Sequence, residues 1–90
     1  MRRVRFLVTG KVQGVGFRWF VRAEARPLHL SGWVRNRQDG AVEGEAAGSD
    51  DAIDALVELL EVGPPSAIVT NVEVSEISDE SLDSNQFEIR

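Results

Sequence analysis

The chain has 90 residues, of which 42% are hydrophobic and 28% are charged, a balance typical of one globular domain (residues 1–90) with a core of modest size. It contains no cysteine and one histidine, which excludes disulfides, a thiolate nucleophile and a cysteine metal site, and argues against a Ser-His-Asp triad or a histidine metal site. No apolar run reaches membrane-spanning length, and no apolar signal core follows the N-terminal arginines, so we expect a cytoplasmic protein without a membrane partner.

Charge is divided unevenly along the chain. Residues 1–37 carry nine basic side chains and one acidic side chain, whereas residues 38–90 carry one basic and fourteen acidic side chains, for a net charge of −5. Nucleic-acid binding normally requires a basic domain, which this chain is not. The positive charge of the first part instead favours a small anionic ligand that is held locally.

A glycine-rich segment follows the first predicted strand. Residues 3–9 alternate between apolar and polar side chains, as a half-buried strand does, and the glycine loop at 10–18, Gly-Lys-Val-Gln-Gly-Val-Gly-Phe-Arg, comes directly after them. Glycines let main-chain N–H groups converge, and the start of a helix attracts anions, so this loop is suited to phosphate or carboxylate. Arg18 falls in the first helical turn, and its guanidinium matches phosphate oxygens.

The spacing of these glycines differs from both common nucleotide-binding motifs. The Walker loop ends in Gly-Lys-Ser/Thr, and the dinucleotide fingerprint requires a third glycine where Trp19 stands. Spacing alone therefore leaves two interpretations open: an anion site, and a tight strand-to-helix connection without a ligand.

A helix and a hairpin are expected after the loop. Apolar side chains at helical spacing predict a helix over residues 17–26, which Pro27 ends because proline has no N–H to donate. Two strand patterns follow, over 30–37 and 41–47, and an Asp-Gly turn signal at 39–40 joins them.

A second helix and two more strands complete the pattern. Either Ser49 or Asp50 is suited to cap a helix whose apolar positions repeat at helical spacing. Strands are predicted over 68–77 and around 87–89, and the polar, acidic residues 78–85 between them predict a surface loop. The order β-α-β-β-α-β with an extra C-terminal strand predicts an α+β, ferredoxin-like sandwich, with two helices on one face of a mainly antiparallel sheet.

Three segments of the sequence resemble the acylphosphatase family. They are the glycine loop at 10–18, the motif Gly-Trp-Val-Arg-Asn at 32–36 with the Asp-Gly and Val-Glu pairs after it, and Gly-Pro-Pro-Ser-Ala at 63–67. The resemblance runs in order over essentially the whole chain and favours the anion site. It implies the ferredoxin-like fold and hydrolysis of acyl phosphates to a carboxylate and inorganic phosphate, without a metal or another cofactor.

The resemblance also implies roles for particular residues. Arg18 corresponds to the arginine that binds the phosphoryl group, and Asn36 corresponds to the asparagine that holds the attacking water. The phosphoryl oxygens would be bound by main-chain amides of the loop, those of Gln13, Gly14, Val15, Gly16 and Phe17. From the residues alone, Asn36 next to a hairpin is more simply interpreted as a turn residue. Trp33 is expected to pack rather than to contact a ligand.

Two positions depart from the family pattern. Arg37 stands where many members have threonine, and an extra cation beside the site is expected to influence substrate preference or pH response. His29 stands where many members have glycine, at the exit of the first helix. Histidine tolerates a left-handed backbone less well than glycine, so this departure bears on local stability rather than on the chemistry.

Two other functions are compatible with the same fold. The first is a non-catalytic module that binds an anion or docks on a protein, against which the presence of both Arg18 and Asn36 argues. The second is an RNA-binding domain, which needs exposed aromatic side chains on a basic sheet face, whereas the third strand presents Glu43 and Glu45. We therefore expect a monomeric hydrolase of a small acyl phosphate that releases inorganic phosphate and has no nucleic-acid partner.

Overall fold

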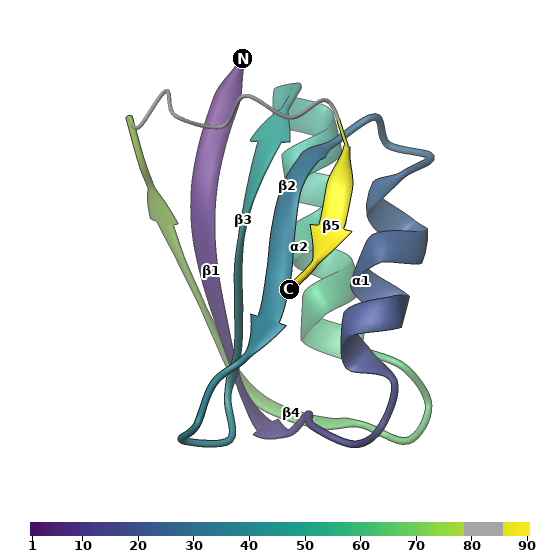
Figure 1. The fold of residues 1–90 in the computed structure, drawn as a ribbon. Coiled ribbons are helices and arrows are strands. Elements are labelled where there is room, and N and C mark those ends of the chain that lie inside the picture. The colour runs from purple at the N-terminus through teal and green to yellow at the C-terminus, as the bar shows by residue number, and fades with distance from the viewer. Residues whose placement is uncertain (79–85) are drawn as a thin grey trace.

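The computed structural model describes residues 1–78 and 86–90, and it contains the predicted strands and helices in the predicted order (Figure 1). Of the surface loop predicted over 78–85, only Ser78 is among the described residues. The elements are β1 (Arg2–Lys11), α1 (Phe17–Ala25), β2 (Ser31–Asn36), β3 (Val42–Gly48), α2 (Asp50–Val62), β4 (Ile68–Glu76) and β5 (Phe87–Ile89).

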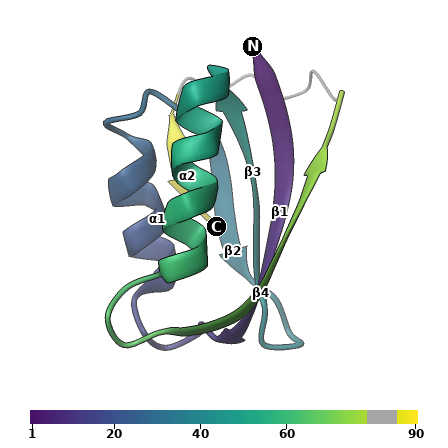
Figure 2. The ribbon, with the colours of Figure 1, turned by 180° about the vertical axis from the view of Figure 1, so that it is seen from behind.

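The strands form one five-stranded sheet in the order β4-β1-β3-β2-β5. Neighbouring strands are antiparallel except β2 and β5, which are parallel. Both helices cover the same face of the sheet, and the other face is open (Figures 1 and 2). This arrangement confirms the predicted ferredoxin-like sandwich with an extra C-terminal strand. Neither helix is long and apolar enough to cross a membrane, a statement that covers the described residues.

The core lies between the sheet and the two helices. Alternate residues of β1 face it, and they meet the apolar stripes of both helices because residues three and four apart share one side of a helix. Its largest fully buried side chains include Phe6, Phe17, Phe87, Ile53, Leu56 and Leu60. Burying one such side chain contributes about 1.5–3 kcal/mol, so this layer stabilises the scaffold that carries the loops.

The strand pairing brings the glycine loop next to the β2–β3 hairpin. β1 and β3 are antiparallel with Val8 opposite Val42, so the end of β1 and the start of β3 lie at the same end of the sheet. Asn36 is the last residue of β2 and also pairs with Val42. The glycine loop that follows β1 and the hairpin that follows Asn36 therefore lie side by side, as both views of the ribbon show (Figures 1 and 2).

Several element boundaries differ from the sequence prediction by one or two residues, and the structure decides between the two candidate caps of α2. β1 extends to Lys11 because it continues to pair with β4 past a register irregularity between Thr9 and Gly10. α1 ends at Ala25, and Arg26 is its capping residue rather than its last turn. Of the two candidate caps for α2, Ser49 is the one used: its hydroxyl accepts a hydrogen bond from the Ala52 N–H at 3.1 Å.

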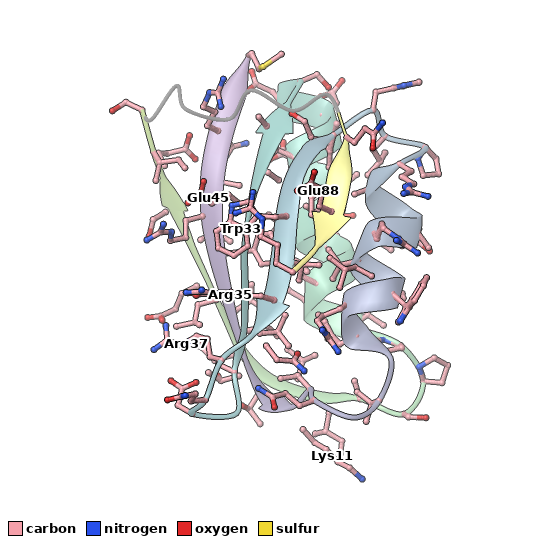
Figure 3. All side chains as sticks on the ribbon, viewed as in Figure 1. Lys11, Trp33, Arg35, Arg37, Glu45 and Glu88 are labelled. Atoms are coloured by element: carbon pink, nitrogen blue, oxygen red, sulfur yellow. The ribbon has the colours of Figure 1, made fainter. Side chains whose placement is uncertain are left out.

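The open face of the sheet carries charged side chains packed over one tryptophan. Glu43 and Glu45 are on this face, as alternation predicts, but only 8% and 6% of their surface is exposed. Arg5 Nη2 lies 2.6 Å from a Glu45 carboxylate oxygen, and Arg35 Nε donates to Glu43 at 2.6 Å. Trp33 is 8% exposed on the same face, which confirms its predicted packing role (Figure 3).

Candidate active site

One cavity of about 140 Å³ joins the glycine loop, the first turn of α1 and the end of β2. Arg18 and Asn36, the two predicted catalytic residues, both line it although they come from different elements. The full lining is Val12, Gly14, Gly16, Phe17, Arg18, Trp19 and Asn36. The structure thus brings together a guanidinium, a carboxamide and the start of a helix.

Two glycines give the loop its backbone path. Gly14 has a φ of 73° and Gly16 a φ of 78°, both in the left-handed region that costs side-chain-bearing residues about 1–2 kcal/mol. A Cβ at either position would meet no atom within 4 Å. Glycine is therefore favoured at both positions by backbone conformation rather than by lack of space.

No side chain at the N-terminus of α1 caps the helix or balances its dipole. Gly16 is the capping residue and offers no side-chain hydrogen bond, and the first turn contains no acidic residue. The first N–H groups of a helix have no intrahelical acceptor, and the helix dipole adds partial positive charge there. An anion in the cavity would supply both the missing acceptor and the missing charge.

Arg18 is half-buried at this helix start, and its positive charge is available. Its Nη1 donates to the main-chain oxygen of Arg90 at 3.5 Å, a long contact. No Asp or Glu side chain among residues 1–78 and 86–90 forms an ion pair with Arg18, whereas Arg2, Arg5, Arg35 and Arg37 each have at least one such partner. The guanidinium is therefore free to bind an anion bidentately.

Asn36 ends β2 with its carboxamide at the cavity. The side chain is half-buried, and within the described part of the chain it makes no hydrogen bond to another residue. Its N–H₂ group and its carbonyl oxygen can thus donate to and accept from a bound water. A rigid strand end holds a small polar group more precisely than a long loop does.

Gln13 and Val15 were predicted to bind oxygens through their amides, but neither residue lines the cavity. Val15 packs against the hydrophobic core. The Gln13 side chain instead turns to the hairpin, where Nε2 donates to the carbonyl oxygens of Arg37 at 2.7 Å and Ala41 at 3.0 Å. These two bonds tie the glycine loop to both sides of the turn in the hairpin that carries Asn36. Sequence reasoning missed this contact because its partners lie 24 and 28 residues away.

Comparison with known proteins identifies the family of this chain. The family model for acylphosphatase matches residues 4–89. This chain belongs to the acylphosphatase family. An acylphosphatase from Bifidobacterium longum is 53% identical over 75 residues, which cover 83% of this chain and 77% of the relative.

Solved acylphosphatases share the whole fold with this family member. The crystal structure of the Bacillus subtilis acylphosphatase has a TM-score of 0.93 at 44% identity and covers 100% of this chain and 99% of the other. An acylphosphatase from Coxiella burnetii has a TM-score of 0.92 at 46% identity, with coverage of 99% and 92%. The match includes the glycine loop and the hairpin end, because these alignments span nearly the entire chain.

Arg37 and His29, the two positions expected to depart from the family pattern, lie in the hairpin turn and in the turn after α1. The Arg37 guanidinium pairs with Asp39 at 3.0 Å and with Glu43 at 3.4 Å, so its charge is largely neutralised within the hairpin. The Ala41 N–H, which donates to Asp39 at 3.1 Å, and the Arg37 cation hold the pKa of the Asp39 carboxyl below its usual value. His29 has a φ of 58°, as expected for a left-handed turn residue after α1.

Trp19 is a cavity residue that sequence reasoning did not assign. It follows Arg18 directly and is 62% exposed, which is unusual for so large an apolar side chain. The Arg22 guanidinium lies 4.1 Å from the centroid of its ring. No group of three His, Cys, Asp or Glu side chains in the described ranges is placed to hold a metal ion.

Proposed function

We propose that this chain hydrolyses acyl phosphates to a carboxylate and inorganic phosphate, with Arg18 and the loop amides binding the phosphoryl group and Asn36 orienting the attacking water. One observation carries the assignment: a guanidinium without an acidic side-chain partner in the described residues, an uncapped helix start and a carboxamide line the same small cavity. Family membership supplies the reaction class.

An acyl phosphate carries a good leaving group. The carboxylate that departs has a parent pKa of about 4, so it needs no general acid to protonate it. What remains is to neutralise charge on the phosphoryl oxygens and to place a water in line with the breaking P–O bond. Phosphoryl transfer is catalysed mainly by such positioning and electrostatics.

Each part of the cavity has one task in this mechanism. Arg18 and the N–H groups at the start of α1 bind the three non-bridging oxygens. Asn36 holds a water whose oxygen forms the new bond to phosphorus while the bond to the acyl oxygen breaks. The cavity lining contains no carboxylate or imidazole, so the water proton passes to a phosphate oxygen of the substrate. The products are a carboxylate and dihydrogen phosphate.

The proposal is tested by turnover of benzoyl phosphate with a chelator present. We expect the wild-type chain to hydrolyse it, whereas an anion-binding module would bind inorganic phosphate without turnover. Asn36→Ala is expected to lower kcat by roughly 10²–10³-fold, the usual effect of losing one preorganised polar group. Its inhibition constant for inorganic phosphate should stay close to that of the wild type, because Arg18 and the amides remain.

Asn71→Ala is the matched control for this variant. Asn71 lies exposed on β4, away from the cavity, and its substitution should leave kcat unchanged. Wild-type turnover in Asn36→Ala, or a parallel loss of phosphate binding, would show that Asn36 does not orient the water.

A further inference from the structure

The cavity lining divides into polar groups and apolar side chains. Its polar side chains are those of Arg18 and Asn36, and its glycines belong to the loop. In the proposed mechanism these groups contact the phosphoryl oxygens and the attacking water. The acyl group therefore has to lie against the rest of the lining, at the solvent-exposed rim of the cavity.

Trp19 supplies the accessible apolar surface at that rim. The other large apolar residues of the lining, Val12 and Phe17, are 1% and 2% exposed and belong to the core. The large hydrophobic side chains that are exposed among the described residues are Met1, Trp19, Val62 and Ile68, and of these only Trp19 lines the cavity.

The indole is also held in place. Arg22 lies one helical turn after Trp19, and its guanidinium stacks over the ring at 4.1 Å from the centroid. This cation–π contact restricts the ring and covers part of it, while 62% of the residue stays exposed. A restricted aromatic ring loses less conformational freedom when a ligand packs on it.

We propose that Trp19 is a specificity-determining residue that packs against the acyl group and favours acyl phosphates with a planar, apolar acyl group. This inference rests on the proposed function. A flat ring stacks on another flat ring more favourably than on a methyl group, and aromatic pairs change binding by roughly 2- to 12-fold. The aromatic acyl group of benzoyl phosphate should thus gain more from Trp19 than the methyl group of acetyl phosphate.

The test compares kcat/KM for benzoyl phosphate and acetyl phosphate in the wild type, Trp19→Ala and Trp19→Phe. In Trp19→Ala the ratio of benzoyl to acetyl kcat/KM should fall roughly 2- to 12-fold, mainly through KM for benzoyl phosphate. Trp19→Phe keeps an aromatic ring and should retain most of the ratio.

Trp33→Phe is the matched control. Trp33 lies 8% exposed on the open face of the sheet and does not line the cavity, so its substitution should not change the ratio. An unchanged ratio in Trp19→Ala, or equal losses for both substrates, would overturn the acyl-binding role. If the wild type hydrolyses neither substrate, the proposed function itself fails, and this outcome is distinct from the other two.

Discussion

The two helices of this chain begin in opposite ways. α2 begins after Ser49, whose hydroxyl accepts the Ala52 N–H, and Asp50 and Asp51 place negative charge in its first turn. α1 begins after Gly16, which offers no side-chain cap, and its first turn carries no acidic residue. A cap stabilises a helix start by about 1 kcal/mol and each well-placed charge by about 0.3–1 kcal/mol, so α1 lacks stabilisation that α2 has.

This difference separates a helix start that its own chain stabilises from one that is left open to a ligand. In α2 the chain satisfies its own N–H groups and dipole. In α1 the same groups stay open beside Arg18, and an exogenous phosphoryl group would act as the missing cap. The glycine loop is held instead by the two hydrogen bonds of the Gln13 side chain and by the packing of Val15 against the core.

The largest effect is expected from Arg18→Gln, which removes the positive charge at the open helix start. Turnover of benzoyl phosphate should fall at least 10²–10³-fold, because losing one donor to developing charge costs roughly 3–4 kcal/mol and here a full charge is lost as well. Arg26→Gln, at the exposed end of the same helix, is the control and should keep wild-type kcat. Equal turnover in the wild type and Arg18→Gln would contradict the proposal that Arg18 and the start of α1 bind the phosphoryl group.

A smaller effect is expected from Gln13→Ala, which frees the loop from the hairpin. Two hydrogen bonds are lost, and at about 0.5–1.5 kcal/mol each the free energy of unfolding should decrease by roughly 1–3 kcal/mol. Because the hairpin carries Asn36, kcat should fall more than phosphate affinity does. Gln38→Ala changes an exposed glutamine of the same hairpin and serves as control in denaturant unfolding and steady-state kinetics. Indistinguishable unfolding of the two variants would contradict the role of Gln13.

Gly16→Ala tests the backbone of the open helix start. The left-handed φ is expected to cost about 1–2 kcal/mol of stability, and the shift in the amides should raise the inhibition constant for inorganic phosphate. The control is Gly40→Ala. Gly40 has a φ of 95° and equally open surroundings, but it lies in the hairpin turn. It should lose similar stability without weakening phosphate inhibition. If both variants weaken it equally, the effect is one of general stability.

The smallest effect is expected at the other helix, from Ser49→Ala. Losing the cap should lower the free energy of unfolding by about 1 kcal/mol, measured by denaturant titration. Turnover should not change, because α2 contributes no residue to the cavity lining. A drop in kcat at unchanged folded fraction would mean that the two helix starts are not functionally separate.

The elements of the fold were predictable because each depends on a local pattern. Alternation placed β1 and β3, and helical spacing placed both helices. The extension of β1 to Lys11 was not predictable, since it results from pairing with Ile68 more than fifty residues later. The burial of Glu45 was also missed, because Arg5, which covers it, comes from a neighbouring strand.

The candidate site was predictable in part. The motifs and the family resemblance named Arg18 and Asn36, and the structure places both at one cavity, while their catalytic roles stay predictions. The side-chain contacts of Gln13 and the rim position of Trp19 depend on how the loop meets the hairpin and how α1 is rotated. Neither leaves a local pattern in the sequence that identifies it.

The most direct test of the anion site is a crystal structure of this chain with inorganic phosphate bound. We expect one phosphate at the start of α1, with its oxygens about 2.7–3.2 Å from the Arg18 guanidinium and from main-chain nitrogens of the glycine loop, and with a water between it and Asn36. Phosphate bound only on the open sheet face, beside Arg35 and Arg90, with the cavity at α1 empty, would contradict the assignment.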